Sequence, residues 1–248
     1  MGSEGDRSEG ARGPSAFARV LAWGVHAFTA SGLFCAFLAL LATERRDFRA
    51  ALLWLGAALA VDCLDGALAR AARVAEILPR YDGRMLDFVA DFLNFVFLPA
   101  LLLYRSGRLG VEGLPWIALI LFSAAYHFGN RDAVSETQEF VGFPAFWNLV
   151  AFYLLLLDLA PAWNRAAVGL VAVLHFVPIR FAYPTRDAAR SRFRAALAAA
   201  WLAAALATAW RYPEVPPALL ALDVGLLAAM AALSLRATFH ARRASAAP

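Results

Sequence analysis

The sequence predicts an all-α fold, a polytopic bundle of about eight transmembrane helices with both chain termini in the cytoplasm. Of the 248 residues, 62% are hydrophobic, and the mean hydropathy of +0.60 exceeds that of a soluble globular domain of this size. Apolar runs near the roughly 20 residues that a hydrocarbon core requires recur along the chain. A lipid bilayer is therefore the expected solvent.

Eight apolar segments follow one another, separated by short links that contain Gly, Pro and Arg. They are Val20–Ala42, Arg49–Leu68, Leu86–Tyr104, Leu114–Phe128, Phe143–Leu159, Ala166–Phe181, Phe193–Trp210 and Pro217–Leu235. The fifth and sixth are short for a full crossing, so a different tilt or shifted boundaries are expected there. We divide the chain into a polar N-terminal tail (1–19), one membrane domain (20–240) and a C-terminal tail (241–248). The first apolar segment is too long for a signal-peptide core, so we expect it to be retained.

The arginines indicate the orientation of the bundle. All 23 basic residues are arginine, and with a cytoplasmic amino terminus most of them lie in cytoplasmic segments. The link 180–194 alone carries five, whereas the link with Arg45, Arg46 and Arg49 is a local exception. The net charge of +4, without a basic stripe interleaved with aromatics, favours contact with anionic headgroups. We expect no nucleic-acid partner.

Acidic residues are concentrated at the facing ends of the second and third expected helices. The stretch from Val61 to Asp91 reads VDCLDGALARAARVAEILPRYDGRMLDFVAD and contains six of them. Carboxylates inside a membrane are costly, so a functional reason is expected. At about 100° per residue, Asp62, Asp65, Gly66 and Ala69 share one face of the second helix.

The third helix carries a similar stripe. Gly83, Asp87 and Asp91 are spaced by four residues and therefore stack along one side. Four carboxylates gathered from two such helices would repel one another unless divalent cations compensated their charge. An all-oxygen ligand set favours Mg²⁺ or Mn²⁺, and the cysteines and histidines show no zinc-ligand spacing. We predict a divalent-metal site on Asp62, Asp65, Asp87 and Asp91.

Small residues and one arginine accompany the aspartates. Gly66, Ala69 and Gly83 lack bulk where a ligand would have to approach the backbone. Arg70 adds a planar, permanently charged fork that suits a phosphate. Together with Asp62, these residues predict a nucleotide diphosphate site.

The pattern DxxDGxxAR followed by GxxxDxxxD, from Asp62 to Asp91, resembles the signature of the CDP-alcohol phosphatidyltransferase family. The gap of twelve residues between Arg70 and Gly83 is longer than in most members. It is similar to the bacterial branch that condenses CDP-diacylglycerol with choline to phosphatidylcholine and CMP. The later segments SAAYHFGN, VGFPAFWNLVAFYL and LHFVPIRF resemble that branch as well.

The resemblance implies a multi-pass protein of the bacterial inner membrane whose active site faces the cytoplasm. It implies that Asp62, Asp65 and Asp87 hold Mn²⁺ or Mg²⁺, two ions in all, and that Asp91 completes the site and is the general base. It also implies a CDP pocket formed by Gly66, Ala69 and Arg70, with Gly83 permitting close approach. CDP-diacylglycerol and choline would be the substrates, and a homodimer is a family expectation.

Choline carries a quaternary ammonium group, which proteins bind with aromatic faces and a nearby carboxylate. The candidates for this role are Tyr126, Glu136, Phe143, Trp147 and Tyr153. For each aromatic residue an ordinary place at the membrane interface or in the helix core is the competing interpretation.

Two alternatives stay open at this point. The acceptor could be serine, inositol phosphate or glycerol phosphate, although a phosphorylated acceptor would require more arginines around the third helix than the sequence has. A cation transporter would also place carboxylates in the membrane. It would predict inverted repeats, yet DxxDGxxAR occurs once.

Overall fold

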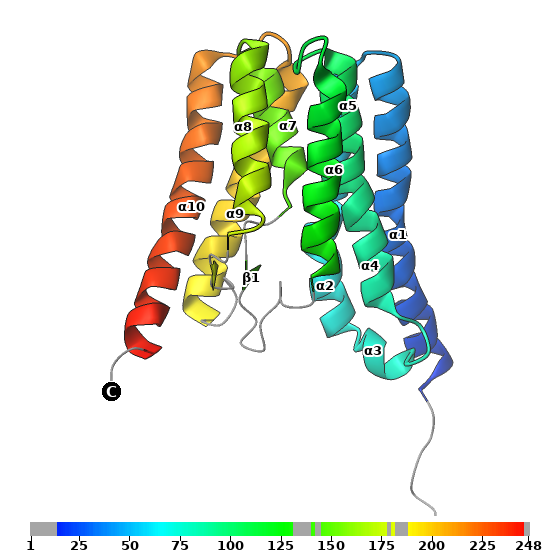
Figure 1. The fold of residues 1–248 in the computed structure, drawn as a ribbon. Helices are drawn as coiled ribbons and strands as arrows, with labels where there is room; N and C mark the ends of the chain where they lie inside the picture. The colour runs from blue at the N-terminus through cyan, green and yellow to red at the C-terminus, as the bar shows by residue number, and fades with distance from the viewer. Residues whose placement is uncertain (1–13, 131–139, 142–144, 178–179, 182–187, 246–248) are drawn as a thin grey trace, which may run out of the picture.

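A computed structural model of the chain describes residues 14–130, 140–141, 145–177, 180–181 and 188–245. The described helices stand side by side in one bundle, and α1 begins at the end of the bundle where α10 finishes (Figure 1). The elements in chain order are α1 (Ala16–Glu44), α2 (Phe48–Ala71), α3 (Val74–Ile77), α4 (Gly83–Asp91), the π-helical turn η1 (Phe92–Phe97), α5 (Leu98–Ser106), α6 (Gly113–Gly129), β1 (Phe140–Val141), α7 (Trp147–Leu156), α8 (Pro161–Leu174), β2 (Arg180–Phe181), α9 (Ala188–Arg211) and α10 (Pro217–Ser245).

The expected all-helical membrane bundle is confirmed. Each of the eight apolar segments contains a helix in the part of the chain that the structure describes. Four helical runs are long and apolar enough to cross a bilayer: α1, α2, the continuous run Gly83–Ser106, and Arg192–Arg211 within α9. The helices α6 and α7 and the first part of α10, Pro217–Leu233, are shorter and also apolar.

The boundaries of the fifth and sixth segments differ from the expected ones. The helix α7 covers only Trp147–Leu156 of the expected 143–159, of which residues 142–144 lie outside the described part. The helix α8 begins early, at Pro161, because a proline in the first turn needs no backbone N–H partner and has a helical φ. It ends at Leu174, and the last expected residues form β2, which pairs antiparallel with β1.

The third membrane span, α4–η1–α5, starts at Gly83 because the side chain of Asp82 caps it. One carboxylate oxygen of Asp82 accepts hydrogen bonds from the backbone N–H groups of Arg84 and Met85, at 3.0 and 3.2 Å. The π-helical turn begins directly after Asp91 and precedes Pro99, which cannot donate a helical hydrogen bond and would crowd the preceding turn. The wider turn accommodates the proline, so the span is irregular one turn beyond its aspartates.

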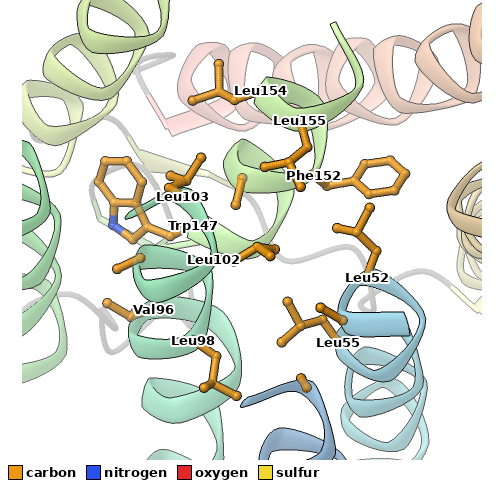
Figure 2. Packing of buried hydrophobic residues seen from close by; sticks show 14 of the residues in the cluster. Leu52, Leu55, Val96, Leu98, Leu102, Leu103, Trp147, Phe152, Leu154 and Leu155 are labelled. Carbon is orange, nitrogen blue, oxygen red and sulfur yellow. The ribbon is translucent and has the colours of Figure 1, made fainter. Parts of the chain in front are cut away.

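The hydrophobic core packs α5 and α7 against α2, the second membrane span. The indole of Trp147 on α7 and the side chains of Leu102 and Leu103 on α5 are fully buried. Figure 2 shows them grouped near Leu52 and Leu55 of α2. This packing ties α2 and the third span, which carry the aspartates, to one rigid scaffold.

A buried polar cluster links three further helices. Asp223 of α10 is fully buried, and its Oδ1 accepts a hydrogen bond of 3.1 Å from the hydroxyl of Tyr153 on α7. The same hydroxyl accepts a bond of 3.2 Å from the indole N–H of Trp201 on α9. Asp223 lies six residues after the start of α10, at the end of the bundle opposite α3 (Figure 1). The cluster therefore connects α7, α9 and α10 in the half remote from α3.

Tyr153→Phe is expected to lower the free energy of unfolding by about 1–2 kcal/mol, because it removes one of the hydrogen-bond donors to the buried Asp223. Reversible unfolding in detergent micelles, followed by circular dichroism, measures the change. Tyr104→Phe is the matched control, since its ring is 45% exposed. Equal stability of the Tyr153→Phe variant and the wild type would show that this cluster contributes nothing to folding.

Candidate active site

The structure brings together three of the four aspartates that the sequence analysis singled out. Asp62 comes from the second half of α2, whereas Asp87 and Asp91 lie one helical turn apart on α4. One carboxylate oxygen from each of the three lies within 4.8 Å of the other two, and all three residues are half-buried. The two acidic faces predicted from helical spacing therefore do meet.

Asp65 lies near enough to interact electrostatically with Asp62, Asp87 and Asp91. It lies on α2 one turn after Asp62 and is only 6% exposed, so it is the most buried of the four. The group of oxygens within 4.8 Å contains Asp62, Asp87 and Asp91 but not Asp65. The role of Asp65 as a further metal ligand stays a prediction.

The donor set fits a divalent cation. Three carboxylate oxygens at this separation repel one another strongly in a half-buried site. The ion pairs among the described residues use other acids, namely Glu44, Glu76, Asp82, Glu112 and Asp158. A compact group of oxygens without a cationic side chain is the arrangement that Mg²⁺ or Mn²⁺ binds.

The small residues and the arginine of the motif adjoin the aspartates on α2. A Cβ atom added to Gly66 would lie 3.3 Å from Nη1 of Arg70, so the guanidinium group lies beside this glycine. Arg70 is exposed and Ala69 is half-buried. Arg70 thus follows Gly66 by one helical turn, and its charged fork extends back to lie beside that glycine.

The space beside Gly83 is filled by a residue that the sequence analysis left out of the site. A Cβ atom added to Gly83 would lie 2.8 Å from Cε1 of His26, on α1. The imidazole of His26 packs on Tyr81 of the α3–α4 link, with the ring centroids 4.4 Å apart and the ring planes tilted by 49°. Periodicity could not reveal this contact, because His26 is separated from the motif by most of two helices.

Asn94 is a second residue that was missed. It follows Asp91 by three residues, is 4% exposed, and donates a hydrogen bond of 3.2 Å from Nδ2 to the carbonyl oxygen of Gly32 on α1. An amide within an otherwise apolar run, directly after the motif, is the signal by which it could have been found.

The candidate choline residues fall into separate places. Tyr126 at the end of α6 is 51% exposed and packs on Phe176, with ring centroids 4.7 Å apart. Trp147 is fully buried and contacts His175, which in turn lies 5.5 Å from the ring of His127. Tyr126 and Trp147 therefore share one neighbourhood between α6, α7 and the end of α8.

That neighbourhood adjoins the aspartate-bearing span. The ring of Phe128, at the end of α6, packs on Phe88 and Phe92 at 4.9 and 5.5 Å between centroids. Phe88 and Phe92 each follow one of the aspartates in sequence. Tyr153 lies apart, in the polar cluster with Asp223, and the remaining candidates Glu136 and Phe143 lie outside the described residues.

Comparison with known proteins agrees with this site. The sequence model of the CDP-alcohol phosphatidyltransferase family matches residues 25–178, which include the whole aspartate motif. A phosphatidylcholine synthase of Pseudomonas aeruginosa is 48% identical over 166 residues, which cover 66% of this chain and 70% of that protein. The enzyme of the same name from Agrobacterium fabrum is 39% identical over 172 residues, 68% of this chain and 71% of the other. A third, from Legionella pneumophila, is 35% identical over 167 residues and covers 66% of each chain.

The family model covers the region in which Asp62, Asp87 and Asp91 converge. With the signature, the membrane bundle and the carboxylate geometry in agreement, the chain belongs to the CDP-alcohol phosphatidyltransferase family.

Proposed function

We propose that this chain transfers the phosphatidyl group of CDP-diacylglycerol to choline, forming phosphatidylcholine and releasing CMP. The observation that carries the proposal is the convergence of Asp62, Asp87 and Asp91 from the two halves of the family motif. The name of the relatives, phosphatidylcholine synthase, supports choline as the acceptor. Membership of the family favours transfer over the transport of cations.

In the proposed reaction the hydroxyl oxygen of choline attacks the phosphorus that bears the diacylglycerol. The bond from that phosphorus to the bridging oxygen breaks, and CMP leaves with this oxygen. The carboxylate of Asp91 accepts the hydroxyl proton as the new bond forms. Direct displacement requires no covalent enzyme intermediate, so one base and one binding site for the diphosphate suffice.

The four aspartates of the motif are proposed to hold Mn²⁺ or Mg²⁺, as two ions with Asp65 as a further ligand. A bound divalent cation supplies positive charge to the diphosphate and to the departing CMP. The chain itself contributes a fixed carboxylate geometry, because Asp62 and Asp87 come from helices that pack in one bundle. Gly66, Ala69 and Arg70 are proposed to contact the nucleotide, with Gly83 at its edge.

The site is proposed to open toward the cytoplasm of a bacterial inner membrane. The links at one end of the bundle carry an excess of arginines, which favours that end as the cytoplasmic one. The short helix α3, which follows the motif helix α2, lies at the same end (Figure 1), so the motif is near that side. Choline and CMP are soluble in water and could exchange there, while the acyl chains stay in lipid. The homodimer stays a prediction.

For choline, the proposed surface lies where α6 adjoins the aspartate-bearing span. Tyr126 offers an exposed ring, to which a cation binds with about 0.5–2 kcal/mol, whereas the fully buried Trp147 stays a prediction for this role. Glu136, Phe143 and Tyr153 stay predictions for the same role.

Acceptor choice tests this proposal. Purified protein in liposomes with CDP-diacylglycerol and Mn²⁺ is offered labelled choline, serine, inositol phosphate or glycerol phosphate in separate reactions. We expect labelled lipid from choline, and less than about a tenth as much from any other alcohol. A site that binds a quaternary ammonium group rejects alcohols of different shape and charge and fails to distinguish only close isosteres of choline. Efficient labelling by a different alcohol would replace choline and keep the reaction class.

A further inference from the structure

The first membrane helix, α1, packs along the aspartate-bearing span, and two of its contacts flank Asp87 and Asp91. Before Asp87 in the span, the imidazole of His26 lies against Gly83. After Asp91, the carbonyl oxygen of Gly32 accepts the hydrogen bond from Asn94. Gly83 precedes Asp87 by four residues, and Asn94 follows Asp91 by three. The two catalytic carboxylates of α4 therefore lie between the two contacts.

The contact at Gly83 depends on space rather than on backbone conformation. Gly83 is not among the glycines with a left-handed φ, so its conformation is open to other residues. An added Cβ would approach Cε1, Nδ1 and Nε2 of His26 to 2.8, 3.5 and 3.9 Å. The first of these distances is a steric clash, so a side chain at position 83 has to displace either the imidazole or the first turn of α4.

The imidazole has little freedom to move away. His26 is 7% exposed, and its ring contacts Tyr81 at 4.4 Å and Trp23 at 5.8 Å between centroids. Within the described part of the chain, its buried Nε2 has no hydrogen-bond partner. Packing on three sides therefore holds the ring, and the ring in turn fixes how closely α1 approaches Gly83.

The second contact lies in the irregular part of the span. Asn94 belongs to η1, the turn in which regular helical hydrogen bonding is interrupted. Its bond to Gly32 attaches this turn to α1. The helix α1 also packs along α2, which carries Asp62. The helix α1 thus contacts both segments that carry the aspartate cluster, α2 and the third span.

We infer that His26 and Asn94 are positioning residues, through which α1 sets the place of Asp87 and Asp91 relative to Asp62. The inference rests on the proposed function only for its link to catalysis, because the carboxylate geometry also determines how tightly the free protein binds Mn²⁺. Residues that orient metal ligands typically contribute about 10- to 100-fold to metal affinity.

A double-mutant cycle on Gly83 and His26 tests the inference. Titration calorimetry measures Mn²⁺ binding to the purified chain, without lipid substrate or choline, for Gly83→Ala, His26→Ala and the double variant. Gly83→Ala is expected to weaken binding about tenfold in the wild type. In the His26→Ala background the same change is expected to have less than about a twofold effect, because the added methyl group then has room.

Gly24→Ala is the matched control, because a Cβ at this position on α1 meets nothing within 4 Å. It should bind Mn²⁺ as the wild type does. An equal loss on Gly83→Ala in both backgrounds would overturn the inference, because the added methyl group would then act independently of His26. Wild-type protein that binds Mn²⁺ but releases no CMP would count against the proposed function alone.

Asn94→Leu tests the second contact without relying on the His26 variant. The two side chains have the same number of non-hydrogen atoms and the same branching at Cγ, and leucine cannot form the hydrogen bond to Gly32. We expect Mn²⁺ binding to weaken about tenfold, at an unchanged helix content by circular dichroism. Unchanged Mn²⁺ binding by this variant would remove Asn94 from the inference.

Discussion

Replacing Asp91 with Asn is expected to lower the rate of CMP release by about 10²- to 10⁴-fold, the contribution of a well-placed general base. The amide has the same shape as the carboxylate but cannot accept the proton of the attacking hydroxyl. CMP release by purified protein in liposomes, with CDP-diacylglycerol, choline and Mn²⁺, measures the change. Because Asp91 also belongs to the carboxylate cluster, the rate is measured up to saturating Mn²⁺, where a loss of the base persists.

Asp158→Asn provides the matched control for this change. Asp158 lies in the link between α7 and α8, its side chain is 78% exposed, and its φ of 47° is one that asparagine tolerates. It should retain the wild-type rate. An Asp91→Asn protein with more than about a tenth of the wild-type rate would exclude Asp91 as the base, because base catalysis contributes at least about 10²-fold.

Loss of the divalent cation is expected to have an effect of similar size. Chelation should abolish CMP release, and Mn²⁺ or Mg²⁺ should restore it, since the three clustered carboxylates then regain their compensating charge. Asp62→Asn removes one ligand from α2 and should raise the Mn²⁺ concentration for half-maximal rate by at least about 10- to 100-fold.

Glu112→Gln is the control for Asp62→Asn, since its side chain is 77% exposed in the link before α6. It should leave the metal dependence as it is in the wild type. CMP release that continues in excess chelator, or a metal dependence that Asp62→Asn does not change, would contradict the assignment of this cluster as a metal site.

The sequence predicted the helical bundle well because hydrophobic length is a direct consequence of spanning a bilayer. It predicted the meeting of Asp62 with Asp87 and Asp91 because helical spacing fixes which residues share a face. It placed the ends of α7 and α8 less well. Those ends depend on a proline in the first turn of α8 and on the short pairing of β1 with β2, which hydropathy does not reveal.

Contacts between helices distant in sequence could not be read from periodicity. The close approach of His26 to Gly83 and the bond from Asn94 to Gly32 depend on how α1 is placed against the third span. The same holds for Tyr153, which the sequence offered as a choline residue and which the structure shows bonded to Asp223 and Trp201. Polar residues in a membrane helix have several possible partners, and only the packed bundle decides among them.

The most direct test of the account is the stoichiometry of the reaction with one purified protein. Liposomes that contain CDP-diacylglycerol receive the protein, labelled choline and Mn²⁺, and both labelled phosphatidylcholine and free CMP are quantified over time. The account predicts equal amounts of the two products at every time point and neither product when choline or the metal is omitted. CMP released without labelled lipid, or the absence of both products from folded protein, would contradict it.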